Sequence, residues 1–397
     1  MQAKDGKNTK TALICWELGG GLGHISPIIE LAKQLIDKHY RIIIAAKDLK
    51  HQSLLQHQQI TWLQAPQLPT VPVYQSPSCC FAETLLRLGY DDPAKISDSV
   101  KAWLSLYQRI QPDLTFFDFS PSAQLAFYNK SCEKILIGST FTDPVNHENI
   151  CGLYDANKPD AAKKLQSQII VNINQACLDN KIHSLQKLSD LYTNLNGRIY
   201  FTIEELDHFQ NRLSSEKQFF VGNIGMQSTN IPSWPKTSHI QKKVFAYIAL
   251  DKFSNTLIQG LVQSNQSCLI CVKSDFEIPN ILPDNIQIID KTVNIESIKS
   301  DCDLIITNAS ANIATEISMS GIPHLVWPTM LEQKLLSDSL IAKKLARLLD
   351  CTMPERVAVQ VNRELKKKSK IRETVKEKYQ DFNSIKKLQA ALTQLGV

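Results

Sequence analysis

The sequence contains no long apolar run. Among its 397 residues, no stretch reaches the roughly 18 consecutive apolar residues that a membrane-spanning helix needs. Residues 1–10 are polar and basic and lack the apolar core of a secretory signal peptide, so we expect a disordered tail. These two absences predict a cytoplasmic protein without a transmembrane segment.

Cysteine is present, with 10 residues, but without the spacing of a disulfide framework or a zinc site. The C-x-x-C pair, Cys268 and Cys271, lies in an apolar run that predicts a strand. A strand directs these two side chains to opposite faces, so we interpret them as small buried hydrophobic residues. Unpaired cysteines fit a reducing cytoplasm, and we expect no metal site from them.

An excess of charge of one sign is also absent. Lys and Arg number 44 against 39 Asp and Glu, a net charge of +5 that is small for this length. No basic stripe interleaved with aromatic residues occurs, so we expect no nucleic-acid partner. The basic cluster at 363–372 is diluted by Glu364, Glu373 and Glu377, which favours a solvated helix face. Peripheral contact with a membrane surface stays open as the alternative.

What the chain does have is a repeated alternation of strands and helices. Apolar segments predict strands at 11–16, 41–46, 60–64, 114–117, 134–137, 198–202, 218–221, 244–249, 267–272, 286–289, 304–307 and 324–327. Helical periodicity favours helices after residue 23, at 94–109, at 161–192 with a break near Asn180, at 254–263, at 310–320 and from 332 to the end. Such alternation is typical of doubly wound α/β sheets.

A composition shift separates two such alternations. Residues 226–242 are rich in Pro, Ser, Thr and Asn and predict a linker. The linker divides the chain into a first domain at 11–225 and a second domain at 243–375, followed by a C-terminal segment at 376–397. Two domains of about 150–200 residues each agree with the chain length. Ligands of such sheets bind at the carboxyl ends of strands, so the turns there are the candidate sites.

The turn after the first strand is glycine-rich. Gly19, Gly20, Gly21 and Gly23 allow a sharp turn and leave room for a ligand beside the backbone, and His24 follows them. A tight strand–helix connection without a ligand would use the same residues. The pattern is not G-x-G-x-x-G, which counts against a dinucleotide site.

The surrounding motifs resemble one family. The run Trp16-Glu-Leu-Gly-Gly-Gly-Leu-Gly-His-Ile-Ser-Pro27 resembles the opening of bacterial relatives of the UDP-glycosyltransferases, which have the GT-B fold. Further similar motifs are Ala82–Tyr90, Pro112–Pro121, Val244–Ile248 after Trp234-Pro235, and a stretch from Asp303 through Thr315-Glu316, Gly321-Ile-Pro323 and Pro328 to Glu332-Gln333. Each motif alone is weak, but together they span nearly the whole chain in the family's order.

The resemblance implies a fold and a reaction. The fold is α/β, with two Rossmann-like doubly wound domains facing each other across a cleft, and with the last helix packing back on the first domain. The reaction is transfer of a sugar, with inversion, from a nucleoside diphosphate sugar to an acceptor hydroxyl. The nucleotide sugar is a co-substrate and no other cofactor is implied. No Asp-x-Asp motif stands in the expected place, so metal dependence is not implied either.

On the acceptor side, the resemblance assigns catalytic roles to His24 and Asp118. Imidazole suits a general base because its ordinary pKa, about 6.5, is near working pH. Asp118 would hold the histidine, so we predict that the two side chains lie within hydrogen-bonding reach. Gly20, Gly21 and Gly23, with Thr140, are placed in the adjoining acceptor-side loops. The simpler interpretations are a packing histidine and an aspartate that initiates a turn.

On the donor side, the resemblance points to the turn Asn308-Ala309-Ser310-Ala311-Asn312. Backbone N–H groups and the dipole of the following helix suit a diphosphate. The family usually has His-Gly-Gly at the start of this turn, and Asn308 cannot supply a positive charge. Simple helix capping by Ser310 and Asn312 is the alternative.

Three further residues belong to the donor side by resemblance. Glu316 would accept hydrogen bonds from the ribose, and Glu332 and Gln333 would hold the sugar hydroxyls. An exposed helix residue and an acidic helix N-terminus are the alternatives. The acceptor (a small molecule or a lipid) and the choice among UDP, dTDP and GDP stay open. So do two other functions: a sugar-nucleotide epimerase or hydrolase, and a catalytically impaired protein that binds a sugar nucleotide or glycan.

Overall fold

The computed structural model of the chain describes residues 9–69, 78–144, 159–209, 212–225, 228–235, 241–248, 254–272, 283–291 and 293–397. Nearly all of the expected disordered tail lies outside the described residues. The same holds for residues 226, 227 and 236–240 of the expected linker.

The chain forms two compact units. The first comprises Met1–Ile203, Asn211–Gly225 and Asn383–Val397, and the second comprises Glu204–Gln210 and Met226–Phe382. Two segments belong to a different unit from the one that the sequence predicted. Glu204–Gln210, from the expected first domain, and residues 376–382, from the expected C-terminal segment, belong to the second unit.

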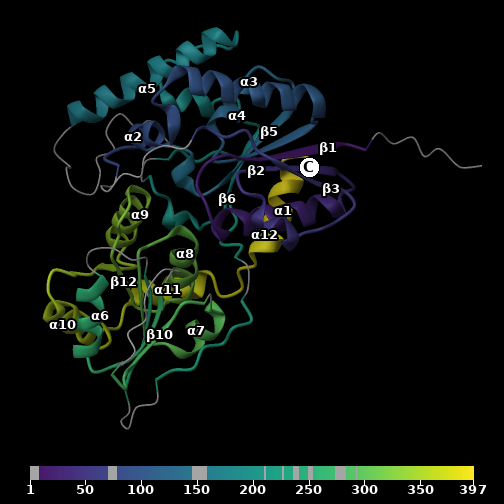
Figure 1. Ribbon diagram of the computed structural model, residues 1–397. Helices are drawn as coiled ribbons and strands as arrows, with labels where there is room; N and C mark the ends of the chain where they lie inside the picture. The colour runs from purple at the N-terminus through teal and green to yellow at the C-terminus, as the bar shows by residue number, and fades with distance from the viewer. Residues whose placement is uncertain are drawn as a thin grey trace, which may run out of the picture. The chain divides into compact units, whose positions relative to one another are not determined.

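The first unit is built on a seven-stranded sheet (Figure 1). Its strands are Thr11–Trp16 (β1), Arg41–Ala46 (β2), Ile60–Gln64 (β3), Leu114–Asp118 (β4), Glu133–Gly138 (β5), Gly197–Tyr200 (β6) and Gln218–Phe220 (β7). All neighbouring strands are parallel, in the order β3-β2-β1-β4-β5-β6-β7. β1 is buried along its whole length, as expected of a parallel strand that is covered on both faces.

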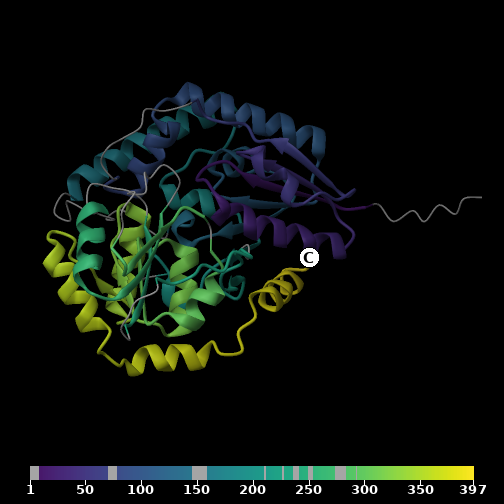
Figure 2. The ribbon, with the colours of Figure 1, turned by 60° about the horizontal axis from the view of Figure 1, so that its bottom comes forward.

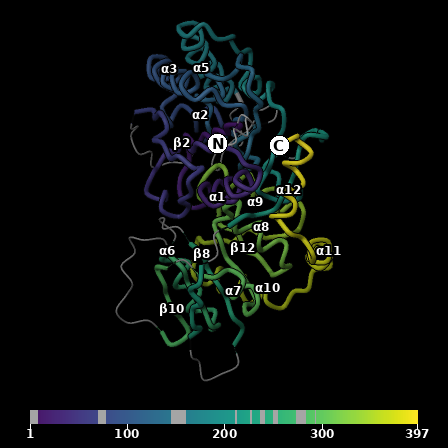
Figure 3. The backbone as a smooth tube through the Cα atoms, turned by 90° about the vertical axis from the view of Figure 1, so that its right-hand side faces the viewer, coloured from purple at the N-terminus to yellow at the C-terminus, as the bar shows by residue number. Residues whose placement is uncertain are grey.

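Helices cover both faces of this sheet (Figures 1 and 3). They are Leu22–Asp37 (α1), Phe81–Leu85 (α2), Pro93–Ile110 (α3), Pro121–Ala126 (α4), Pro159–Asp179 (α5) and Ser384–Gln394 (α12), with short turns at Leu49–Leu54 (η1), Leu86–Tyr90 (η2), Thr140–Thr142 (η3) and Leu188–Tyr192 (η4). α1 and α12 pack on one face, where Ile14, Ile28 and Leu392 share a core. On the other face, Phe127 lies between Phe117 of β4 and Trp103 of α3.

The last helix belongs to the first unit although it ends the chain (Figure 2). Gln389 of α12 donates a hydrogen bond to Gln34 of α1 at 2.8 Å, and Lys38 donates to the carbonyl oxygen of Val397 at 2.7 Å. Because Leu388 and Leu392 are fully buried, α12 completes the core on this face of the sheet.

The second unit repeats the design with six parallel strands. They are Lys243–Ile248 (β8), Ser267–Val272 (β9), Ile286–Ile289 (β10), Leu304–Thr307 (β11), His324–Val326 (β12) and Arg347–Leu348 (β13), in the order β10-β9-β8-β11-β12-β13. The helices are Ser254–Gln263 (α6), Ile295–Asp301 (α7), Ala311–Ser320 (α8), Leu331–Ala342 (α9), Pro354–Glu364 (α10) and Lys370–Lys378 (α11), with a short turn at Glu204–Leu206 (η5). α6 and α10 share a core on one face of the sheet, and α7 and α8 pack on the other.

The prediction of helices alone from residue 332 to the end is wrong at Arg347–Leu348, because this segment pairs with β12 as the edge strand β13. The predicted break near Asn180 in the helix over 161–192 is confirmed, whereas the prediction that the α-helix continues from there to residue 192 is wrong. Asn180 ends the helix, because its side chain bonds to Ala176 O and Ser97 Oγ, and Lys181 then takes a left-handed φ of 57°. Cys268 and Cys271, by contrast, face the two different cores of the second sheet, so the prediction for them is confirmed. No helix among the described residues is long and apolar enough to cross a membrane.

Candidate acceptor and donor sites

The residues predicted for the acceptor side meet where the strand order of the first sheet reverses. β1 and β4 are neighbours there, with Trp16 opposite Asp118 in the register. The loop after Trp16 leads into α1, of which His24 is the third residue. Ligands of open α/β sheets bind at such a reversal, at the carboxyl ends of the strands.

His24 and Asp118 are in direct contact, which confirms the predicted geometry. His24 Nδ1 lies 2.9 Å from Asp118 Oδ2. The Asp118 side chain is 4% exposed, whereas the His24 side chain is 23% exposed. An ionised carboxylate at Nδ1 favours the tautomer that carries its proton on Nδ1 and leaves Nε2 as the basic nitrogen.

Two neighbours shape the environment of the imidazole. The Trp16 ring stacks on it, with ring centroids 5.5 Å apart and 19° between the planes. Gly19 has a φ of +78°, and a Cβ built on it would lie 2.3 Å from His24 Nε2. A side chain at position 19 would therefore displace the ring, so the presence of glycine at this position has a steric explanation.

The other acceptor-side residues divide into two groups. Gly20, Gly21 and Gly23 are exposed beside His24. Thr140, expected in an acceptor-side loop, has no solvent exposure. Thr140 therefore lies within the packed turn after β5.

Glu17 is a buried carboxyl group that sequence reasoning missed. It follows Trp16 directly and is 2% exposed. Its Oε2 accepts a hydrogen bond from the Ser122 N–H at 2.9 Å, and its Oε1 accepts one from Tyr90 Oη at 3.3 Å. Burial raises the pKa of this carboxyl to about 7 although these hydrogen bonds oppose the shift. The sequence feature that could have identified Glu17 is its position directly after a strand predicted to be buried.

On the donor side, Asn308 is a buried link between strand ends. Its Nδ2 donates a hydrogen bond to the carbonyl oxygen of Trp327 at 3.0 Å, which ties the end of β11 to the end of β12. Ala309 follows with a φ of 59° and is fully buried. This is the left-handed region, which a glycine occupies without strain.

The Ala309 N–H is engaged inside the protein. It donates to Thr307 Oγ1 at 2.9 Å, and the same oxygen lies 2.9 Å from His324 Nε2. Burial, with a contribution from Arg372, lowers the pKa of His324 to about 3, so the ring is neutral at ordinary pH. One N–H group of the turn predicted to bind the diphosphate therefore already donates its hydrogen bond to Thr307.

The turn then opens into the N-terminus of α8. Ser310 is the N-cap, and its side chain makes no capping hydrogen bond. Ser310, Ala311 and Asn312 are all partly exposed. The first N–H groups of a helix have no partner within the helix, so this end of α8 suits an anion.

Glu316 is held by a lysine from the neighbouring helix. Its Oε2 lies 2.7 Å from Lys299 Nζ of α7, and this ammonium also binds Glu296 at 2.6 Å. Burial lowers the pKa of Lys299, but Glu316 and Glu296 more than offset this, so its pKa is raised. Sequence reasoning missed Lys299, because it lies 17 residues from Glu316.

The two residues at the start of α9 have different environments. Gln333 is 9% exposed, and its Oε1 accepts hydrogen bonds from the Thr329 N–H and hydroxyl at 2.8 and 3.0 Å. Glu332 is more exposed and lies 3.8 Å from Nε2 of the buried His208. His208 belongs to Glu204–Gln210, the segment that joins the second unit. No group of three or more His, Cys, Asp or Glu residues in the described parts could hold a metal ion.

Known structures resemble the whole chain. The glycotransferase of kitacinnamycin has a TM-score of 0.70 at 14% identity, covering 97% of this chain and 98% of its own. The calicheamicin glycosyltransferase CalG4 has a TM-score of 0.69 at 16% identity, covering 98% and 99%. The glycosyltransferase VinC, in complex with DTDP, has a TM-score of 0.64 at 13% identity, covering 98% and 100%. The chain has the GT-B fold.

At this level of identity the resemblance concerns the fold. No protein-family model matches the sequence, and no curated protein matches it either. On the GT-B fold, the predicted residues gather at the carboxyl edges of the two sheets. His24 and Asp118 meet at the first, and residues 308–312 stand at the end of β11 in the second.

Proposed function

We propose that this chain transfers a sugar from a nucleoside diphosphate sugar to an acceptor hydroxyl with inversion, with His24 as the general base. The contact of 2.9 Å between His24 Nδ1 and Asp118 Oδ2 carries the proposal. A partly exposed imidazole backed by a buried carboxylate is the arrangement that proton abstraction requires. The GT-B fold and the glycosyltransferases that share it support this choice of reaction.

The chemistry of the acceptor step follows from the tautomer. The acceptor hydroxyl gives its proton to His24 Nε2 while its oxygen forms a bond to the anomeric carbon of the sugar. The bond from that carbon to the diphosphate oxygen breaks, and the nucleoside diphosphate leaves with the bonding electrons. Asp118 stabilises the imidazolium that forms, and the stacked Trp16 ring favours the same cation.

The proposal assigns donor binding to the second unit. The N–H groups at the start of α8 would hold the diphosphate, and the positive end of the helix dipole would stabilise the leaving group. Glu316 would accept hydrogen bonds from the ribose hydroxyls while Lys299 keeps its carboxylate in place. Glu332, which is partly exposed, is the candidate for the sugar hydroxyls, with Gln333 beside it.

One observation favours a second candidate, a protein that binds a nucleotide or glycan without transferring sugar. Asn308 stands where the resembling family has histidine, and its amide is bonded to Trp327. The neutral Asn308 adds no cation to the diphosphate turn, and the Ala309 N–H is already taken by Thr307. Calorimetry with UDP, dTDP and GDP separates the two candidates. If a nucleoside diphosphate binds to Asn308→His but not to wild type, the protein has lost the ability to use a nucleotide-sugar donor.

The experiment on the base compares wild type with His24→Ala and Asp118→Asn, and uses the exposed His57→Ala as the control. Release of nucleoside diphosphate is measured from UDP-, dTDP- and GDP-glucose. We expect His24→Ala to lower the rate by about 10²–10⁴ while binding of the nucleoside diphosphate persists. Wild-type turnover by His24→Ala would remove the general-base role.

A further inference from the structure

The turn after β5 is a buried loop that begins next to Asp118. Its residues Thr140, Phe141, Thr142 and Asp143 are at most 4% exposed. Gly138, the last residue of β5, leads into the loop with a φ of +127°, and a Cβ built on it would lie 2.9 Å from Asp118 Oδ1 and 3.4 Å from Thr142 Oγ1. The end of β5, which leads into the loop, therefore lies against the Asp118 carboxylate, with Thr142 on its other side.

Arg212 binds this loop through its backbone carbonyls. Its Nη2 donates to the carbonyl oxygens of Thr140 at 3.1 Å and Asp143 at 2.9 Å. Its Nη1 donates to Asp143 Oδ2 at 2.9 Å and to Tyr200 Oη at 3.1 Å. A buried loop needs partners for its carbonyl groups, and here one guanidinium supplies two of them. The guanidinium also lies 4.9 Å from the centroid of the Tyr200 ring, within the range of a cation–π contact.

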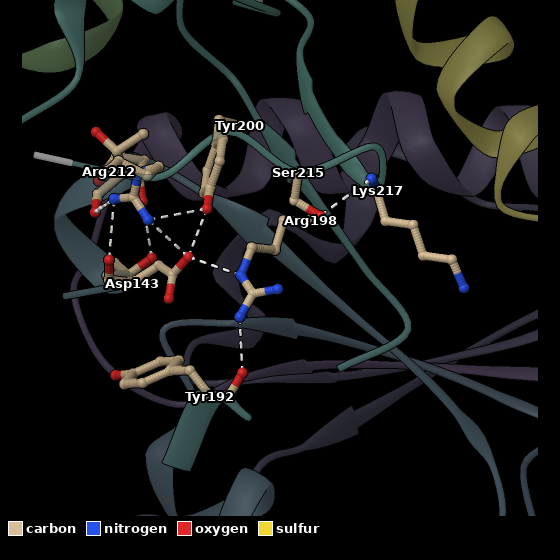
Figure 4. A network of polar contacts seen from close by, with 10 residues as sticks. Asp143, Tyr192, Arg198, Tyr200, Arg212, Ser215 and Lys217 are labelled. Carbon is tan, nitrogen blue, oxygen red and sulfur yellow. Dashed lines mark hydrogen bonds and ion pairs between the residues drawn. The ribbon is translucent and has the colours of Figure 1, made fainter. Parts of the chain in front are cut away.

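Arg198 belongs to the same cluster but makes different contacts (Figure 4). Its Nε donates to Asp143 Oδ2 at 3.0 Å, and its Nη2 donates to the carbonyl oxygen of Tyr192 at 2.7 Å. Both arginines bring a positive charge to the same carboxylate oxygen, which also accepts a hydrogen bond from Tyr200. Of the two, Arg212 is the one that holds the Thr140–Asp143 turn by its carbonyls.

We propose that Arg212 is a positioning residue for the His24–Asp118 pair. It holds the Thr140–Asp143 turn, the turn keeps Gly138 in place against the Asp118 carboxylate, and that carboxylate stands 2.9 Å from His24 Nδ1, where it orients the imidazole. Any effect on sugar transfer rests on the proposed function, whereas the effect on the hydrogen bond between His24 and Asp118 does not. Arg212 lies far from both in the sequence and acts through the loop, so it need not touch a substrate.

Comparing Arg212→Gln with Arg198→Gln isolates the effect of the hydrogen bonds from Arg212 to the carbonyl oxygens of Thr140 and Asp143. Each variant removes one guanidinium from Asp143, so the change of charge is the same in both. Three quantities are measured: hydrogen exchange of the Thr142 and Asp143 amides, the NMR resonance of the His24 Nδ1 proton, and turnover of UDP-, dTDP- and GDP-glucose. The amides suit this test because both are bonded within the turn, to Ser139 O and Thr140 O.

We expect Arg212→Gln to speed exchange of both amides by about tenfold or more, because the turn loses the two charge-assisted hydrogen bonds to its carbonyl groups. The Nδ1 proton of His24 should broaden or lose its downfield shift, and kcat should fall more than the affinity for nucleoside diphosphate. In Arg198→Gln, amide exchange should stay within about threefold of wild type, and the Nδ1 resonance should be unchanged.

Equal effects of the two variants would overturn the proposal, because charge alone would then explain them. An unchanged Nδ1 resonance in a folded Arg212→Gln protein with fast exchange would also overturn it. If Arg212→Gln does not fold, Arg212→Lys is compared with Arg198→Lys by the same criteria, since a lysine keeps the charge but lacks the planar fork. A wild type that turns over none of the donors contradicts the proposed function, while the exchange and NMR measurements still decide the role of Arg212.

Discussion

Glu17 shows how a single residue beside the candidate acceptor site responds to its surroundings. Its carboxyl group is 2% exposed and contacts Ser122 and Tyr90, so it has lost most of the water that would stabilise its charge. Burial raises its pKa from 4.5 to about 7. In the unfolded chain the same group has its ordinary pKa, so folding and proton binding are linked.

This linkage predicts a pH dependence of stability. Below pH 4.5 the carboxyl is protonated in both states, and its contribution to stability is complete. As the pH rises from 4.5 through 7, the unfolded chain ionises this group before the folded protein does, and about 3 kcal/mol of that contribution is lost. We expect Glu17→Gln to be free of this loss, as measured by urea unfolding of the variant and wild type at pH 5 and pH 8.

The exposed Glu133 supplies the control for this prediction. Glu133→Gln should change with pH as wild type does, because its carboxyl group is hydrated in both states. Parallel pH dependence of Glu17→Gln and wild type would mean that Glu17 titrates normally in the folded protein.

At the scale of elements, the start of α8 is determined by its neighbours. The strand before it ends in Thr307, whose hydroxyl binds the Ala309 N–H and lies against the neutral His324 of β12. Asn308 ties the same turn to Trp327. Farther along the helix, Lys299 of α7 holds Glu316. Two strands and two helices thus fix the groups that would bind a nucleotide.

We predict that Glu316→Ala weakens the binding of nucleosides and nucleotides alike. The ribose would lose an acceptor, and one hydrogen bond to a charged group is worth about 1.5–3 kcal/mol. Calorimetry with uridine, UDP, dTDP and GDP measures this loss.

Glu296→Ala is the matched control, because Glu296 binds the same Lys299 ammonium but is exposed on α7. It should leave nucleotide affinity close to that of wild type. If Glu316→Ala also leaves the affinity of a bound nucleotide unchanged, the donor site does not lie on α8.

At the scale of the molecule, each unit is built from separated parts of the chain. Glu204–Gln210 belongs to the second unit, where Glu205 accepts hydrogen bonds from Lys343, Lys378 and Tyr379. α12 belongs to the first unit and buries Leu392 beside Ile28 and Ile14. The stability of the first unit therefore depends on the last residues of the chain.

We predict that Leu392→Ala destabilises the first unit by about 2–5 kcal/mol, the usual effect of a cavity at a fully buried leucine. Hydrogen exchange of the β1 and β2 amides should show this loss, while the β8 and β11 amides should change much less. Ile385→Ala, on the exposed side of the same helix, should be near neutral. Equal loss of protection in β1 and β11 would show that the chain unfolds as one cooperative unit.

The strands other than β13 could be predicted from the sequence, and so, with the help of the family resemblance, could the contact between His24 and Asp118. Buried parallel strands are short apolar runs bounded by turns, and their periodicity is local. Because parallel strands end at one edge of a sheet, the residues after β1 and β4 had to lie close together once these strands were neighbours. Side chains alternate between the two faces of a strand, so the sequence also predicted that Cys268 and Cys271 face different cores.

Only the tertiary structure decided how the polar groups are paired. Four of these polar contacts join residues that are 17 or more positions apart. They are the hydrogen bonds of Glu17 with Ser122, Lys299 with Glu316, Asn308 with Trp327, and Arg212 with Asp143. No local pattern encodes such pairs, because any nearby donor could satisfy the same acceptor. The break near Asn180 was predicted from the sequence, but the contact of Asn180 with Ser97 of another helix was not. The sequence by itself determined where the strands end, and packing determined which side chains meet there.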